Sequence, residues 1–217
     1  MEIFQKKYWE RKQLKKRRHP SHIAIKEFVL PKINAIKKVV PINRKTKLLD
    51  VGAGNGFFSY YFDKICDTTA IDYSEQMIKL NPIKKKRVMD ANKLEYKDNI
   101  FDIVFCHALL HHIEDIDQVI KEMARVSKEY IIILEPNRNN PIMYLFCLWK
   151  KEERKVLKFS LNYLTKLSQK SGLKVISSFS TGMIFANATP KILLPLFRLF
   201  NYRFMFGTTN CIICKKA

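Results

Sequence analysis

No stretch of this 217-residue chain is apolar for the roughly 18 to 20 consecutive residues that a helix needs to cross a bilayer. Residues 1–7 also lack the apolar core of a secretory signal peptide. We therefore expect a cytoplasmic protein. The cysteines fit this compartment, because Cys66, Cys106 and Cys147 stand in apolar surroundings, where a small buried thiol is the ordinary explanation.

Clustered metal-binding cysteines are missing too. Cys211 and Cys214 have C-x-x-C spacing, but they stand in an apolar terminal strand, in which residues three apart point to opposite faces. A second pair with metal-ligand spacing is absent from the sequence. The sequence therefore predicts no metal site and no redox motif.

Acidic residues are half as numerous as basic ones: 20 Asp and Glu stand against 40 Lys and Arg, a formal net charge of +20. Residues 1–45 alone hold 14 Lys and Arg against 3 Asp and Glu. The basic run at 15–19 follows Tyr8, Trp9 and Leu14, a pattern typical of a contact with a membrane surface or with nucleic acid. A solvated N-terminus of a lysine-rich chain accounts for the same pattern.

Apolar residues recur at helical intervals between positions 23 and 40, with Pro31 inside the pattern. The spacing predicts one or two amphipathic helices that pack on the edge of a sheet. Pro31 is expected to interrupt the pattern or to start a new helix, because proline removes a backbone donor.

The most informative stretch of the chain is a glycine loop. An apolar strand ends in Asp50, and glycines follow at positions 52, 54 and 56. A loop without side chains lets the backbone pass close to a ligand and aims its N–H groups there. A dinucleotide fingerprint requires glycine where Phe57 stands, and a phosphate-binding loop requires a lysine that is absent. A nicotinamide oxidoreductase is therefore the least favoured alternative.

Acids recur at the ends of three successive predicted strands. Asp72 follows Gly52 by twenty residues, and Asp90 ends the next strand at 86–89. Ligands of open α/β folds bind outside the carboxyl ends of parallel strands, so these acids are expected to meet at one edge. A carboxylate at Asp72 suits the two hydroxyls of a ribose.

Together, these motifs closely resemble those of the class I S-adenosylmethionine-dependent methyltransferases over about residues 46–137. The resemblance implies an α/β Rossmann-like fold: a seven-stranded, mostly parallel sheet with its last strand antiparallel and helices on both faces. It implies S-adenosylmethionine as the cofactor, with Asp90 accepting from the adenine amino group. The cofactor-binding residues expected on this basis are Asp50, Gly52, Ala53, Gly54, Asn55, Gly56, Asp72, Tyr73, Met77, Asp90, Ala91 and His107.

The expected organisation is a single methyltransferase domain over residues 1–217. Residues 1–45 form its basic helical extension, 46–137 the cofactor-binding core and 138–217 the substrate-side half. An apolar insert at 183–206 suggests a greasy pocket or a membrane-facing lid. A helix that buries itself against residues 141–149 is an equally weighted alternative.

The chemistry of this family asks the protein mainly to hold an acceptor in line with an already activated methyl group. Where the acceptor must lose a proton, His107 is the best-placed base, and His111 and His112 are expected to cap or pack. We predict methyl transfer to a small, hydrophobic or lipid-like acceptor by a cytoplasmic enzyme, peripheral at the membrane. The alternatives are an RNA methyltransferase that uses the basic arm and a non-catalytic cofactor-binding interaction module.

Overall fold

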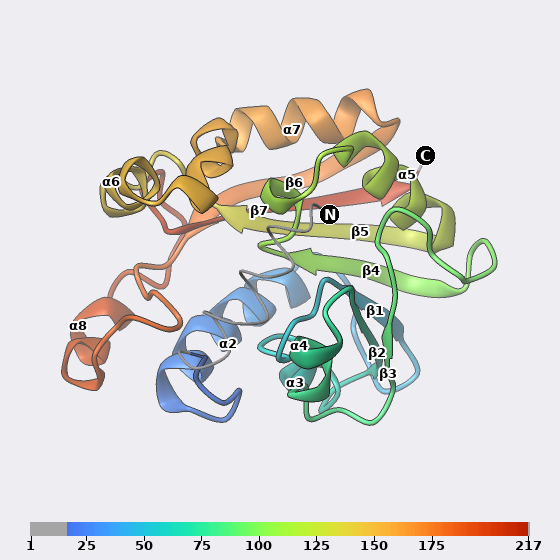
Figure 1. Cartoon of the computed structure of the whole chain (residues 1–217), viewed down its shortest axis with the longest axis horizontal. Helices are drawn as coiled ribbons and strands as arrows, with labels where there is room; N and C mark the ends of the chain where they lie inside the picture. The colour runs from blue at the N-terminus through green and yellow to red at the C-terminus, as the bar shows by residue number, and fades with distance from the viewer. Residues whose placement is uncertain (1–16, 217) are drawn as a thin grey trace.

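The sheet is the framework of the molecule. The computed structural model describes residues 17–216, and these contain one seven-stranded sheet in the order β3-β2-β1-β4-β5-β7-β6 (Figure 1). Strand β7 runs antiparallel to both its neighbours, and the other pairs are parallel, which confirms the expected fold class. The strands are β1 (Lys47–Val51), β2 (Asp67–Asp72), β3 (Lys86–Val88), β4 (Phe101–His107), β5 (Ser127–Pro136), β6 (Leu173–Thr181) and β7 (Thr209–Lys216).

The strand order reverses at β1, which lies between β2 and β4. Chains leaving neighbouring strands there run to opposite faces of the sheet, so a crevice opens at the carboxyl ends of these strands. Strand β1 delivers the glycine loop to this point, and the register places Asp50 opposite Ala70 of β2 and Phe105 of β4.

Helices cover both faces of the sheet. Helix α2 (Ile23–Lys37) and the short α3 (Ser59–Phe62) pack on one face, and α5 (Ile116–Val126) and α7 (Leu161–Lys170) on the other (Figure 1). Leu48 and Leu49 belong to different core clusters because successive side chains of a strand point to opposite faces. Cys211 and Cys214 are likewise divided between the two cores, as expected.

Polar side chains cap the starts of three helices. Ser74 caps α4 (Glu75–Lys79), Asp115 caps α5 and Ser160 caps α7, and each side chain accepts from a backbone N–H in the first turn. Such caps satisfy donors that a helix start otherwise leaves without an intrahelical partner.

Helix α2 corrects the expected break at Pro31. The helix runs unbroken through Pro31, because Ile25, Val29 and Ile36 are buried against the sheet and their packing outweighs the missing backbone donor. Lys32 is buried in the same helix, where its Nζ donates to the Phe28 carbonyl at 2.9 Å. Burial lowers the pKa of Lys32 to about 7. The rest of the predicted basic arm, residues 1–16, lies outside the described residues.

The substrate-side half adds α6 (Pro141–Trp149), a 3-10 segment η4 (Lys151–Lys158), the turn η5 (Lys191–Leu193) and α8 (Leu194–Arg198). The insert does not form a helix buried against residues 141–149, since Leu194 is the one buried residue of α8. Within residues 17–216, no helix is both long enough and apolar enough to cross a membrane.

The third glycine of the loop serves packing. Gly56 has φ +87°, and a Cβ there would collide with the buried side chain of Asn81. Asn81 Nδ2 donates to Ser59 Oγ at 3.1 Å, and Ser59 Oγ donates in turn to Asp50 Oδ2 at 2.5 Å. Gly56 thus makes room for a hydrogen-bonded chain that holds the end of β1.

Gly56→Ala is expected to destabilise the protein by about 1–3 kcal/mol more than Gly172→Ala. Both glycines have positive φ, so the backbone strain is matched, but nothing lies within 4 Å of a Cβ at Gly172. Urea unfolding of the two variants measures the difference. Equal losses would show that the Asn81 contact costs nothing.

Asp50 generates a pH dependence of stability. Burial raises the pKa of Asp50 to about 7, although its hydrogen bond from Ser59 opposes the shift. The native state then holds a proton that the unfolded state has lost, so unfolding free energy falls as pH rises from about 4 to 7, by up to about 1.4 kcal/mol per pH unit.

Asp50→Asn removes this ionisation. The variant is expected to gain stability relative to the natural protein as pH rises from 5 to 8, measured by urea unfolding at each pH. A difference that stays constant with pH would mean that Asp50 ionises at an ordinary pKa.

Candidate active site

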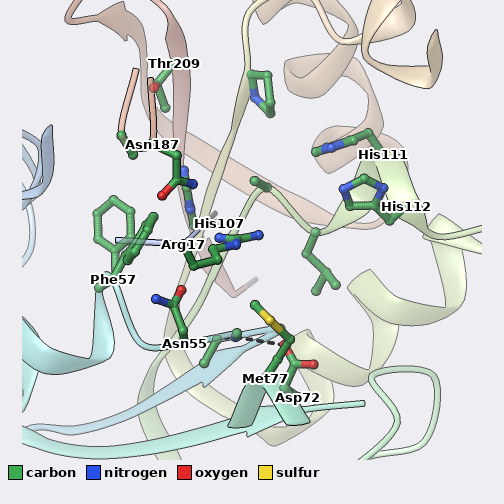
Figure 2. A pocket seen from close by; sticks show the side chains of 18 of the residues that line it. Arg17, Asn55, Phe57, Asp72, Met77, His107, His111, His112, Asn187 and Thr209 are labelled. Carbon is green, nitrogen blue, oxygen red and sulfur yellow. Dashed lines mark hydrogen bonds between the residues drawn. The ribbon is translucent and has the colours of Figure 1, made fainter. Parts of the chain in front are cut away.

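A cavity of about 500 Å³ occupies the crevice at the carboxyl ends of the strands. Eleven of the twelve residues expected to bind the cofactor line it, and Gly56, which packs on Asn81, does not. In Figure 2, Asn55, Asp72 and Met77 lie together at one end of the cavity, and His111 and His112 lie at a distance from them. The sequence motifs are therefore brought together as one site.

Asp72 joins the glycine loop to the start of α4. Its Oδ2 accepts from the Gly54 N–H (Figure 2), and its Oδ1 accepts from the Ser74 N–H, both at 2.8 Å. Burial raises the pKa of Asp72, and the two N–H donors moderate that rise. These hydrogen bonds fix the carboxylate at the cavity wall.

The glycine loop leaves room for a ligand. Gly52 and Gly54 have φ of +69° and +52°. A Cβ at Gly54 would lie 3.2 Å from Met77 Cε and 4.0 Å from Asp72 Oδ2, so it would fill part of the cradle between these side chains. The cavity keeps its shape because Gly54 has no side chain.

The neighbouring strand end contributes Asp90 and Ala91. Asp90 Oδ1 accepts from the backbone N–H of Asn92 at 2.9 Å and from its side-chain amide at 2.8 Å. Both Asp90 and Ala91 line the cavity, and Ala91 is buried. The turn after β3 is therefore held rigidly beside the Asp72 end.

His107 stands at the end of β4 and lines the cavity. Its ring lies 5.5 Å from the Phe28 ring and 4.7 Å from the Phe58 ring, between centroids. Removal from solvent, assisted by the charges of Lys32 and Arg17, lowers the pKa of His107 to about 3. The imidazole is neutral at physiological pH, and its basicity is weak.

Glu135 organises the other end of the cavity. Its buried carboxylate accepts from the backbone N–H groups of Leu109 and Leu110 at 2.9 and 2.7 Å, and lies 2.6 Å from His111 Nδ1. Burial alone would lower the pKa of His111. The Glu135 carboxylate, assisted by Glu153, outweighs this effect and raises the pKa of His111 to about 9. His111 is therefore a fixed cation, packed rather than free to cap, beside the cavity.

Among residues 17–216, one group of side chains has the spacing of metal ligands. Ligand atoms of His111, His112 and Glu153 all lie within 4.8 Å of one another, and His111 Nε2 is 3.4 Å from Glu153 Oε2. The hydrogen-bonded ion pair between His111 and the carboxylates accounts for this arrangement, and the absence of a metal stays a prediction.

The sequence did not indicate that Arg17 and Arg18 belong to the site. Arg17 lines it, and Arg18 bonds to both sides: its carbonyl accepts from Asn55 Nδ2 at 3.0 Å, and its guanidinium donates to the Ala186 and Thr189 carbonyls at 3.0 and 2.8 Å. The partners of Arg18 lie up to 171 positions away in the sequence, so a local sequence pattern cannot predict these contacts.

Away from Asp72, one wall of the cavity is apolar, while His111, Asn187 and Thr209 contribute polar groups (Figure 2). Ile142, Met143 and Phe146 of α6 line it, and Ile184 and Phe185 of the insert complete it. The insert thus contributes to a greasy pocket, as one of the two expectations stated. This end is shaped for a hydrophobic molecule, and the end around Asp72 is shaped for a polar one.

Comparisons with known proteins agree with this geometry. Residues 49–132 match the family model described as a methyltransferase domain. The chain is 31% identical over 96 residues to a phosphatidylethanolamine N-methyltransferase of Cereibacter sphaeroides, a match that covers 40% of this chain and 47% of the relative. It is 28% identical over 147 residues to a demethylmenaquinone methyltransferase of Staphylococcus aureus, covering 63% and 60%. The chain spans about half the length of the curated relatives it matches.

Solved structures share the whole architecture. An S-adenosylmethionine-dependent methyltransferase from Thermotoga maritima superposes with a TM-score of 0.70 at 18% identity, covering 90% of this chain and 92% of that one. A second, from Aquifex aeolicus, gives 0.65 at 17% identity, covering 90% and 94%. The chain therefore has the fold of the class I S-adenosylmethionine-dependent methyltransferases, and residues 49–132 match a methyltransferase domain.

Proposed function

We propose that this protein transfers a methyl group from S-adenosylmethionine to a small, hydrophobic or lipid-like acceptor. The observation that carries the proposal is that one cavity joins two kinds of surface: the part around Asp72 has the polar groups and bare backbone that suit a nucleoside, and the wall formed by α6 is apolar. Both surfaces belong to one space, so a cofactor and an acceptor held there would meet.

The residues at the polar end fit the cofactor. Asp72 presents an anchored carboxylate for the ribose hydroxyls, and Asp90 and Met77 flank the position of the adenine. The cradle over Gly54, which a Cβ would fill, gives the ligand close contact with the backbone. When bound, S-adenosylmethionine supplies an activated methyl group.

The chain's own part in the reaction is positioning. The apolar side chains of α6 and of the insert hold a hydrophobic acceptor and exclude water from the space between the two ends. Glu135 fixes the turn after β4 through two backbone bonds, so this part of the wall keeps its shape.

His107 remains the proposed base where an acceptor must lose a proton. Its low pKa makes it a weak base, because general-base catalysis is most efficient when the pKa of the base lies near the working pH.

The names of the relatives support the hydrophobic acceptor. One is called a phosphatidylethanolamine methyltransferase and the other a demethylmenaquinone methyltransferase, and both names denote lipid-soluble acceptors. A lipid-like acceptor would be reached at a bilayer, which fits the peripheral location expected for this chain.

Asp72→Ala is expected to weaken the binding of S-adenosylhomocysteine by about 10- to 100-fold, because charge-assisted hydrogen bonds to the ribose are lost. Isothermal titration calorimetry measures the affinity. Asp67→Ala is the matched control: Asp67 lies at the other end of the same strand, paired with Lys85 on the surface. Equal affinity of the two variants would remove Asp72 from the cofactor site.

The acceptor class is tested by methyl-labelled cofactor offered with phosphatidylethanolamine vesicles, a demethylated quinone and total RNA. We expect label in a lipid-soluble product. We also expect Met143→Glu, which places a charge on the apolar wall, to lower kcat/KM for that acceptor at least about 10-fold with cofactor affinity unchanged. Label in RNA alone would contradict the proposal.

A further inference from the structure

The exposed apolar side chains of this protein are gathered in two segments. Residues 17–216 expose sixteen large hydrophobic side chains, and thirteen of them lie in α6 or in the segment from the start of η5 to the residue before β7. We call these thirteen the apolar face: Ile142, Tyr144, Leu145, Phe146, Leu148, Trp149, Ile192, Leu193, Leu196, Leu199, Tyr202, Met205 and Phe206.

The two segments are joined at the start of α6. Asn140, which caps α6, donates to the Phe206 carbonyl at 2.7 Å, and Asn137 donates to the Met205 carbonyl at 2.9 Å. In Figure 1, α6 and α8 project from the same end of the molecule, beyond the end of the sheet. The apolar face therefore consists of two exposed segments at one end of the molecule, which meet at residues 205–206.

The exposure is extreme for these residue types. Trp149 is 81% exposed, Ile192 84% and Leu199 70%. Isolated apolar residues on a surface are ordinary, but a gathered set of this size marks a binding surface or an aggregation liability. Helix α6 buries one residue, Cys147, so its apolar sequence is not explained by packing within the described chain.

The charge around the apolar face is mainly basic. Residues 141–206 contain eleven Lys and Arg against two Glu, of which Glu153 faces His111, and Arg198 of α8 pairs with Glu27 at 2.9 Å. Lys151, Arg154 and Lys155 follow α6 directly and are exposed. A surface of this kind, apolar and rimmed by basic residues, matches the boundary between acyl chains and anionic headgroups.

The apolar face also borders the cavity. Ile142 and Phe146 belong to both, since each is exposed and each lines the cavity. A molecule embedded at the apolar face would therefore reach the acceptor end across a single helix.

We infer that the apolar face docks this protein on an anionic lipid bilayer, with α6 and the η5–α8 segment inserted among the headgroups and the cavity opening toward the membrane. The inference rests on the proposed function, because that function requires a lipid-like acceptor. It adds that the acceptor comes from the bilayer on which the apolar face docks. A second copy of the chain is the poorer occupant, because two rims of like charge in a protein of net charge +20 would repel one another.

The test is sedimentation of the full chain with vesicles of phosphatidylcholine alone or mixed equally with phosphatidylglycerol. We expect binding at least 10-fold tighter to the mixed vesicles, and weaker as salt rises. The double variants Leu145→Glu/Trp149→Glu and Ile192→Glu/Leu199→Glu should each lose at least 10-fold in affinity. All four positions are exposed, so the fold is expected to tolerate the changes.

Leu80→Glu/Val88→Glu is the charge-matched control, because both residues are exposed and lie outside the apolar face. It should bind vesicles as the natural protein does. Calorimetry with S-adenosylhomocysteine on every variant separates the two proposals, since docking does not require cofactor binding. Three results would overturn the inference: no vesicle binding by the natural protein, undiminished binding by the two double variants, or a stable dimer that those variants dissociate.

Discussion

The structure depends on the carboxylate of Asp72. It accepts from the Gly54 N–H of the glycine loop and from the Ser74 N–H at the start of α4, and so ties the end of β1 to the end of β2. Burial makes its negative charge costly, and the two N–H donors repay part of that cost. A cofactor with hydroxyl donors would add further bonds to a group that is already positioned, which is the preorganisation that tight binding requires.

Glu135 has the same role on the opposite side of the cavity. It joins the end of β5 to the turn after β4 through Leu109 and Leu110, and it holds His111 as a buried cation. Strand-end carboxylates thus fix both ends of one space, and the apolar residues of α6 close it. The outward side chains of α6 continue that apolar character to the surface, so that the pocket and the proposed membrane contact share a helix.

Much of this was readable from local patterns. The glycine loop and the acids at strand ends are local signals with a direct physical cause, and the structure brings them, Gly56 excepted, to one cavity. What depends on distant partners was not readable. Gly56 leaves space for the side chain of Asn81, and Arg18 bonds to residues near the other end of the chain. The packing of α2 keeps the helix continuous through Pro31. The exposure of the insert likewise follows from what surrounds it rather than from its composition.

The central claim is that Asp72 and the glycine loop hold an adenosyl cofactor in this crevice. A crystal structure of the protein with S-adenosylhomocysteine tests it most directly. We predict both ribose hydroxyls within hydrogen-bonding distance of the Asp72 carboxylate, the adenine beside Asp90 and Met77, and the sulfur directed toward α6. A ligand bound elsewhere, or an Asp72 carboxylate that makes no contact with it, would contradict the account.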